Sequence, residues 1–245
     1  MFVGLCLASA GAAAVNASMS DVDPHKKVWR AHRAPVQGID VSQWQGDIDW
    51  RAVRAAGVQF AFIKATEGGD HIDPKFMQNW YAAKRAGIPR GAYHFVYWCR
   101  SAQDQARWFM RNVPRDPDAL PPVLDVEWNH HSKSCPQKIS RSQALAKIKI
   151  LLDAMYSHTG MRPIIYTDPA FYRDVLRGEL VQYPFWLRSV AAEPHEVYPG
   201  RPWAFWQFTT TGRVPGIRGD VDRNIFNGTR PAWERSIGLT QAASR

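Results

Sequence analysis

Two carboxylates close an apolar segment near the middle of the chain. Asp125 and Glu127 are separated by one residue in Pro121-Pro-Val-Leu-Asp-Val-Glu-Trp128. In an extended strand, residues two apart point to the same face and lie about 7 Å apart. Two carboxylates at this distance disfavour each other's ionisation, so one can keep a proton near neutral pH while the other is an anion. An acid beside an anion suits the hydrolysis of a glycosidic bond.

A bare Asp-x-Glu is more often structural, because strand-end carboxylates commonly cap loops or pair with arginine. Position favours a catalytic role here, since the pair follows apolar and proline residues that indicate a buried strand. Asp40 ends another apolar segment, in Gly38-Ile-Asp-Val-Ser-Gln-Trp44, and Asp222 lies in a late one. Asp222 taken alone is equally compatible with an ordinary turn. Barrel enzymes gather catalytic groups at the carboxyl ends of their strands, so we expect these acids to share one site.

Aromatic residues accompany these acids. The chain has 11 Trp and 8 Tyr, and several of them fall in or just after predicted strands: Trp44, Tyr93, Tyr97, Tyr166, Trp186 and Trp206. The apolar face of a sugar ring can stack on an aromatic ring, whose polar edge can hydrogen-bond a hydroxyl. Core packing explains any single aromatic residue equally well, but the grouping favours a glycan groove.

The elements that must position these residues alternate along the chain. Five apolar segments are each followed by a helical pattern: 36–41, 59–65, 91–97, 122–127 and 163–167. Three further segments, 185–190, 203–209 and 219–225, leave too little chain between them for crossover helices. The pattern predicts an α/β fold, an irregular TIM-like barrel of five βα units followed by three strands with little or no outer helix.

Capping residues give the helix boundaries. Asp73-Pro74 and Asp168-Pro169 are typical helix starts, and Gly87 and Gly178 are the matching ends. Further starts are expected at Asp47 or Asp49, at Ser101 with Asp104, and at Ser140, with ends at Gly57 and Gly160.

The composition is that of a globular chain, with 245 residues, 45% hydrophobic and 22% charged. We expect a signal segment at 1–17 cleaved after Ala17, although its basic start is missing, then a polar tail at 18–35, a barrel at 36–230 and a C-terminal tail at 231–245. Such a protein would be exported, to the periplasm or beyond, with no membrane span after cleavage. The net charge of +9 favours an anionic partner, but the basic residues are scattered and no nucleic-acid-binding motif accompanies them, so no nucleic-acid partner is expected.

The cysteines predict a disulfide. Cys6 lies in the expected signal segment, which leaves Cys99 and Cys135, after the third and fourth strands, as the only pair. Export favours their pairing over two unrelated thiols. No metal or cofactor is expected, because zinc-site spacing and phosphate-binding loops are missing, and the adjacent His130 and His131 cannot easily share one ion.

The sequence as a whole resembles the glycoside hydrolase family 25 lysozymes, also called Chalaropsis-type muramidases, over about residues 36–228. Seven motifs in order carry the resemblance: Gly38-Ile-Asp-Val-Ser-Gln-Trp44, Phe62-Ile-Lys-Ala-Thr-Glu-Gly68, Gly91-Ala-Tyr-His-Phe95, Leu124-Asp-Val-Glu127, Ile165-Tyr-Thr167, Trp206-Gln-Phe208 and Val221-Asp-Arg-Asn224. The chain departs from the family pattern in its loop 129–136 and at Arg188, which leaves subsite preference open.

The resemblance implies an irregular barrel that hydrolyses the peptidoglycan bond after N-acetylmuramic acid. It implies Glu127 as the proton donor, Asp125 as its partner and Asp40 and Asp222 as pocket acids. It also implies groove positions for Tyr93, Tyr166, Trp206 and Gln207. We expect a monomer that acts on peptidoglycan glycan strands and retains anomeric configuration through the substrate's N-acetyl group. A chitinase-like glycosidase and an inactive glycan-binding domain are the alternatives.

Overall fold

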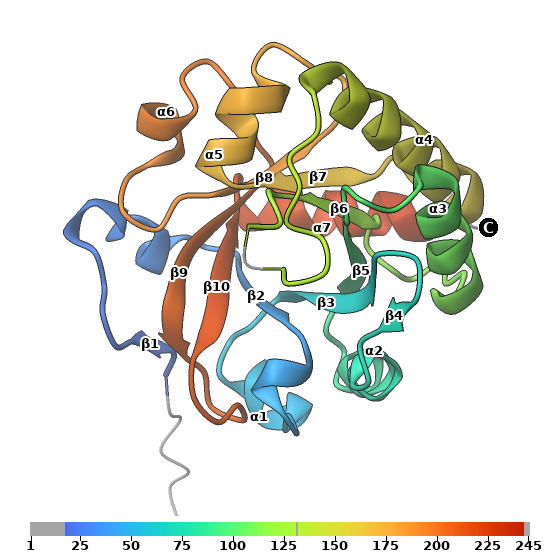
Figure 1. The fold of residues 1–245 in the computed structure, drawn as a ribbon. Helices are drawn as coiled ribbons and strands as arrows, with labels where there is room; N and C mark the ends of the chain where they lie inside the picture. The colour runs from blue at the N-terminus through green and yellow to red at the C-terminus, as the bar shows by residue number, and fades with distance from the viewer. Residues whose placement is uncertain (1–17, 131, 243–245) are drawn as a thin grey trace, which may run out of the picture.

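The eight predicted strands close into one barrel (Figure 1). The computed structural model describes residues 18–130 and 132–242, so the expected signal segment and His131 lie outside the described residues. The barrel strands are β2 (Gln37–Val41), β3 (Phe60–Glu67), β5 (Arg90–Phe95), β6 (Val123–Val126), β7 (Ile164–Thr167), β8 (Phe185–Arg188), β9 (Phe205–Arg213) and β10 (Val221–Phe226). The predicted TIM-like α/β barrel is confirmed.

The last strand runs against the others. The neighbours from β2 through β9 are parallel, whereas β10 pairs antiparallel with both β9 and β2 and thereby closes the barrel. The beginning of β10 therefore lies at the same mouth as the carboxyl ends of the other strands. This register places Asp222 opposite Asp40.

Helices follow the first five long strands, as the capping residues predict. They are α1 (Trp50–Ala55), α2 (Phe76–Arg85), α3 (Ala102–Asn112), α4 (Arg141–Thr159) and α5 (Pro169–Phe171), which continues as the π-helical turn Tyr172–Leu176. A short α6 (Pro194–Val197) follows β8, and β4 (His71–Ile72) pairs with β3. No helix in the described part of the chain is long and apolar enough to cross a membrane.

The predicted caps are present with one shift. Asp49, Ser101, Ser140 and Asp168 each accept a hydrogen bond from a backbone N–H in the first turn of their helix. Asp73 instead accepts from the backbone of Lys75 and of Gln43, and α2 begins three residues later at Phe76. Asp73 thus fastens the loop after β2 to the start of α2.

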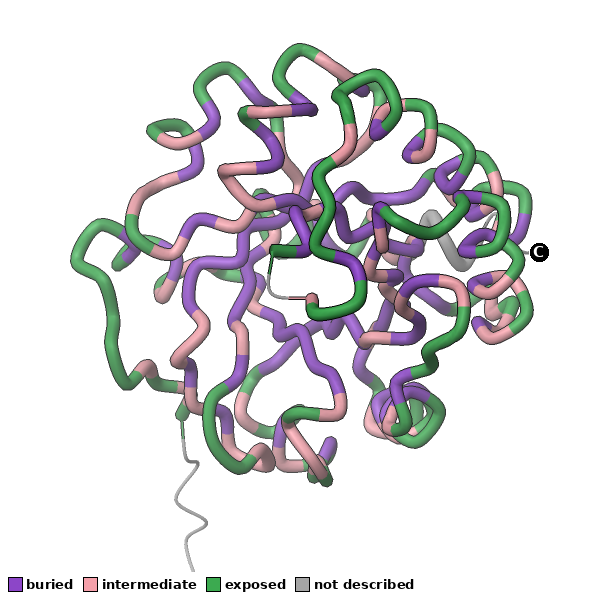
Figure 2. Tube along the Cα trace, viewed as in Figure 1, coloured by how far each residue is buried: buried purple, intermediate pink, exposed green. Residues whose placement is uncertain are grey.

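Aromatic rings fill the barrel interior. Phe60, Phe62, Trp186 and Phe205 pack together there, and Figure 2 shows that the strands are largely buried. Glycine makes room for these rings, since a Cβ on Gly38 would lie 2.5 Å from the ring of Phe60. The apolar filling confines polar chemistry to the mouth.

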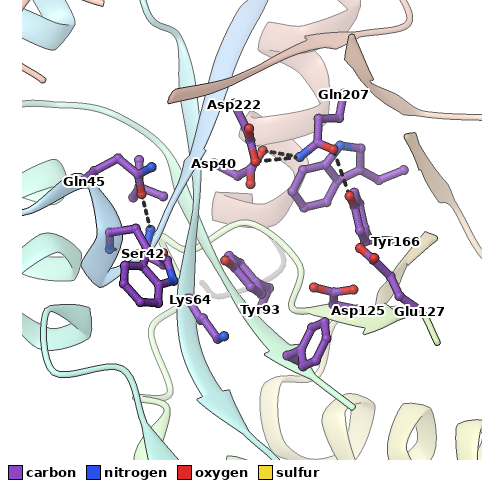
Figure 3. Close-up of a pocket in the computed structure, with 14 residues that line it drawn as sticks. Asp40, Ser42, Gln45, Lys64, Tyr93, Asp125, Glu127, Tyr166, Gln207 and Asp222 are labelled. Carbon is purple, nitrogen blue, oxygen red and sulfur yellow. Dashed lines mark hydrogen bonds between the residues drawn. The ribbon is translucent and has the colours of Figure 1, made fainter. Parts of the chain in front are cut away.

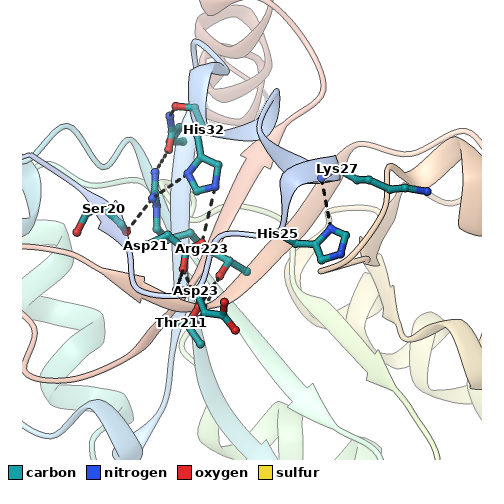
Figure 4. A network of polar contacts seen from close by, with 10 residues as sticks. Ser20, Asp21, Asp23, His25, Lys27, His32, Thr211 and Arg223 are labelled. Carbon is teal, nitrogen blue, oxygen red and sulfur yellow. Dashed lines mark hydrogen bonds and ion pairs between the residues drawn. The ribbon is translucent and has the colours of Figure 1, made fainter.

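The segment 18–35, expected as a polar tail, is part of the fold. Its β1 (Ser20–Asp21) pairs with β9, and Val28 and Ala31 are buried on the outer face of β9 and β10. The Arg223 guanidinium donates to the Ser20 carbonyl at 2.9 Å, and the Thr211 hydroxyl donates to Asp21 at 2.6 Å (Figure 4). The composition of the segment did not indicate this packing, because Val28 and Ala31 are the only apolar residues of its described part that are fully buried.

The C-terminal tail prediction was also wrong, since α7 (Arg230–Ala242) covers the end of the barrel opposite the mouth, behind the strands in Figure 1. Trp233 is 4% exposed, and its ring centroid lies 5.3 Å from that of Phe60. Trp233 of this helix covers the aromatic rings of the barrel interior at that end.

Candidate active site

A pocket opens at the barrel mouth, and every barrel strand contributes a side chain to it (Figure 3). Its lining residues are Asp40, Val41, Ser42, Trp44, Gln45, Lys64, Tyr93, Phe95, Asp125, Glu127, Tyr166, Trp186, Gln207 and Asp222. Four carboxyl groups therefore share one small space, which is the arrangement expected from the strand-end acids.

Asp125 is the most enclosed of the acids. Its side chain comes from β6 and is 7% exposed as a residue, and its Oδ1 has no hydrogen-bond partner among the described residues. Burial raises the pKa of Asp125 well above its ordinary value, the charge of Glu127 adds to the rise, and Lys64 opposes it. A buried carboxyl oxygen without a partner is costly unless a ligand supplies one.

Glu127 follows β6 and has the properties of a proton donor. Its backbone carbonyl accepts a hydrogen bond from the Trp98 indole N–H at 2.6 Å, which fixes the chain at this point. Burial raises the pKa of Glu127 to about 7, the charge of Asp168 adds to the rise, and Arg188 and the Tyr166 hydroxyl oppose it. A carboxyl group with this pKa can both give and take a proton near neutral pH.

Asp40 and Asp222 form a second acidic pair, held by amides. The Gln207 Nε2 donates to Oδ2 of Asp40 at 3.0 Å and to Oδ2 of Asp222 at 3.2 Å. The Asn224 Nδ2 donates to Asp40 at 2.8 Å, and the Tyr166 hydroxyl donates to Gln207 Oε1 at 2.8 Å.

Protons are divided unequally between these two acids. Burial and the charge of Asp40 raise the pKa of Asp222 to about 9. Burial also raises the pKa of Asp40, but Asn224, Gln207 and Asp222 all direct hydrogen bonds at it. Asp222 therefore carries a proton at neutral pH, and Asp40 is the acceptor of the pair.

The pocket brings together most of the residues expected from the sequence: Asp40, Tyr93, Asp125, Glu127, Tyr166, Gln207 and Asp222. Trp206 does not line it. Alternation along β9 turns its side chain away from Gln207, to the outer face, where it is buried against Phe208 and its indole donates to the Ser189 carbonyl at 2.7 Å.

The predicted disulfide between Cys99 and Cys135 is confirmed, with Cα atoms 5.6 Å apart. The two cysteines follow β5 and β6, so the bond joins two neighbouring loops at the mouth. Asn129 accepts from the Trp98 backbone N–H at 3.1 Å, and these contacts hold the loop that follows Glu127.

Two residues of the site, Lys64 and Asn224, were given no role from the sequence. Lys64 on β3 lines the pocket, forms an ion pair with Glu67 and lies 5.1 Å from the centre of the Phe95 ring. Asn224 donates a hydrogen bond to Asp40. Trp44, which the sequence placed among the groove aromatics, lines the pocket and is 82% exposed. Lys64 had a usable signal, because it lies two residues after the inward Phe62 and so faces the same way.

Comparison with known proteins gives one consistent answer. Residues 39–217 match the family described as glycosyl hydrolases family 25. Lysozyme M1 of Streptomyces globisporus is 41% identical over 81% of this chain and 70% of its own length. The N,O-diacetylmuramidase of Arthroderma benhamiae is 32% identical over 94% and 96%. A family 25 glycosyl hydrolase from Bacillus anthracis superposes with a TM-score of 0.79 at 34% identity, covering 88% of this chain and 98% of that one.

Proposed function

The chain belongs to glycosyl hydrolase family 25 and is a glycoside hydrolase of the lysozyme type, and we propose that it hydrolyses the bond between N-acetylmuramic acid and N-acetylglucosamine in peptidoglycan. The observation that carries this proposal is the pair at the mouth, Asp125 and Glu127, with the pKa of Glu127 raised to about 7. The similar proteins named a lysozyme and an N,O-diacetylmuramidase support the substrate.

Glu127 is the general acid and base in this proposal. It protonates the glycosidic oxygen as the bond to the anomeric carbon breaks, which prevents departure of an alkoxide. The ionised Glu127 then takes a proton from the water that attacks the anomeric carbon in the second step. Its pKa suits both steps, because the group must change protonation state twice in each turnover.

Asp125 orients the attacking group. The acetamido N–H of the substrate donates to the Asp125 Oδ1, which has no hydrogen-bond partner among the described residues, and the acetamido oxygen attacks the anomeric carbon. The C–O bond to the leaving sugar breaks as the cyclic oxazolinium bond forms, and the positive charge that develops lies beside the Asp125 carboxylate. Water then opens the ring from the opposite face, so two inversions give net retention.

The second acidic pair binds and aligns the sugar. Asp40, Gln207 and Tyr166 form a connected network whose remaining oxygen lone pairs are available to sugar hydroxyls. Tyr93 adds a hydroxyl to the same wall, and the exposed Trp44 provides a ring on which a neighbouring sugar can stack.

The test is mass analysis of products released from purified peptidoglycan. We expect fragments with N-acetylmuramic acid at the reducing end, and we expect Glu127→Gln to bind glycan without turnover. N-acetylglucosamine at the reducing end would exclude a muramidase, and faster release from chitin would favour the chitinase-like alternative. No release from either polymer would favour an inactive binding domain.

Stereochemistry is tested on the same reaction. NMR of freshly released oligosaccharide should show the β-anomer first, since net retention preserves the configuration of the substrate. The α-anomer as first product would require direct attack by water, with Asp40, Asp125 or Asp222 as its base.

The disulfide bears on where the reaction takes place. A Cys99–Cys135 bond persists in an oxidising compartment, which agrees with a wall substrate outside the cytoplasm. We therefore include export in the proposal. Fractionation of cells that express the chain, with immunodetection in each fraction, tests it, and a cytoplasmic protein with two free thiols would oppose it.

A further inference from the structure

Arg188 is the last residue of β8, at the carboxyl end of the strand. Within this strand Trp186 lines the pocket and Leu187 is buried in the outer core, so alternation returns Arg188 to the pocket side. Its register partner on β9 is Gln207, the amide that joins Asp40 and Asp222. This register places Arg188 on the same face of the sheet as Gln207 and the acids that Gln207 joins.

Among the described residues, the Arg188 guanidinium forms no side-chain hydrogen bond or ion pair, although the residue is half-buried. Lys64, the cation that lines the pocket, differs because it is paired with Glu67. Burial raises the pKa of Asp222 and that of Glu127, and the charge of Arg188 lowers both. Arg188 thus faces the catalytic acids with its own donors unused.

A planar guanidinium with five donors fits a carboxylate or phosphate in a fork of two hydrogen bonds. Half-buried donors are costly to leave unpaired, so a ligand group of this kind would satisfy Arg188. The pocket acids would repel such a group, which makes an opposing cation necessary at the point where it binds.

Muramic acid carries such a group, and this step rests on the proposed function. Its 3-O-lactyl arm ends in a carboxyl group, whereas the N-acetylglucosamine ring has no acid. We propose that Arg188 binds the lactyl carboxylate of the muramyl residue held over Asp125 and Glu127. The site then favours muramyl residues with a free carboxylate over those whose lactyl group is bound as an amide.

The preference sets a place in a reaction sequence. In peptidoglycan the lactyl carboxyl is joined to a peptide through an amide bond, and hydrolysis of that amide sets the carboxylate free. A muramyl-peptide amidase reaction would therefore supply the preferred substrate, and this enzyme would act on glycan from which peptides have been removed.

The kinetic test compares a peptide-free muramyl glycan oligomer, the same oligomer with its lactyl groups converted to primary amides, and the peptide-bearing oligomer. The wild type should favour the free acid over the amide in kcat/KM by about tenfold, the scale of a charged hydrogen bond. Arg188→Gln should lose this preference, and Arg188→Lys should keep part of it, because lysine retains the charge without the fork.

Arg162→Gln is the matched control. Arg162 is exposed just before β7, at the barrel end opposite the mouth, so its replacement removes the same charge far from the pocket. This variant should keep the full preference for the free acid. An equal loss in Arg162→Gln would mean that net charge, and not contact with Arg188, sets the preference.

Calorimetry with Glu127→Gln separates this inference from the proposed function, since binding needs no turnover. The free-acid oligomer should bind about tenfold more tightly than its amide, and adding Arg188→Gln should remove the difference. Equal affinities before and after that change would overturn the inference even if the enzyme proves to be a muramidase. An Arg188-dependent preference for the peptide-bearing oligomer would overturn it too, by assigning the residue to a peptide carboxylate.

Discussion

The pH dependence of kcat/KM is a direct test of the role given to Glu127. In the free enzyme this residue must be protonated to act as the acid, so kcat/KM should fall above a midpoint at about pH 7. Burial sets most of this value and the charge of Asp168 adds to it, while Arg188 opposes it. Neutralising either charge should move the midpoint in a known direction.

The size of the effect follows from the shift itself. The pKa of Glu127 rises from 4.5 to about 7, which corresponds to about 3 kcal/mol of preference for the protonated form. At pH 6 about 90% of the enzyme then carries the proton, against about 3% for an unshifted glutamate. The pocket therefore raises the population of the competent acid about thirtyfold at that pH.

The assay is kcat/KM on a soluble peptidoglycan oligomer between pH 4 and 9, for three proteins. Asp168→Asn should move the midpoint down and Arg188→Gln should move it up, with the wild type between them. Asparagine at 168 can still cap α5, where Asp168 accepts from the Phe171 backbone N–H at 2.7 Å, so the fold is preserved. A midpoint near 4.5, or shifts of the same sign in both variants, would refute the assignment of Glu127.

Three further predictions concern the acidic pair Asp40 and Asp222, the disulfide, and the barrel end that α7 covers. Asp222→Asn should lose less activity than Asp40→Asn, because an amide resembles the protonated carboxyl. The thermal stability of this variant relative to the wild type should increase as pH rises. The raised pKa of Asp222 stabilises the wild type fully below pH 3.8, and this stabilisation is lost as the pH approaches about 9. If the pKa were ordinary, calorimetry at pH 5 and at pH 8 would show the same difference between the two proteins. Replacing Cys99 and Cys135 with serine frees a loop with a sequence separation of 36 residues and should lower the free energy of unfolding by about 3 to 4 kcal/mol in urea titrations, whereas an unchanged value would mean that the bond adds no constraint. Trp233→Ala should cost about 3 to 5 kcal/mol in the same titration, while Trp29→Ala, at a residue 56% exposed, should cost under about 0.5; similar costs would contradict the role of α7 as a cover.

The barrel was predictable because its signals are local. Each long strand is an apolar segment bounded by turn residues, and caps such as Ser140 and Gly160 mark helix ends within a few positions. The covering segments had no local signal. Val28 and Trp233 are apolar residues in polar stretches, and their burial depends on surfaces formed by strands far away in sequence.

The site could be predicted where spacing along a strand alone determines which side chains share a face. Asp125 and Glu127 share a face by strand alternation, but the pairing of Asp40 with Asp222 depends on the antiparallel direction of β10, which apolar patterning does not give. Trp206 and Gln207 were both assigned to the groove, although adjacent strand residues face opposite ways. Which of the two faces inward depends on the pairing of β9 with β8 and β10.

The two roles given to Arg188, its effect on the pKa of Glu127 and its binding of the lactyl carboxylate, together predict how substrate binding changes the enzyme. Arg188 holds the pKa of Glu127 below the value that burial and Asp168 would set, so Glu127 in the free enzyme binds its proton less tightly than it would without Arg188. A lactyl carboxylate bound to Arg188 would cancel that influence and place a further negative charge near Glu127, which favours the protonated acid. The alkaline limb of kcat, which reports the complex, should then lie above that of kcat/KM for the free-acid oligomer. For the lactyl amide the two limbs should coincide, because a neutral group leaves Arg188 uncompensated. Binding of the free-acid substrate would thus keep Glu127 protonated to a higher pH. Coincident limbs for both oligomers would show that Arg188 and Glu127 act independently.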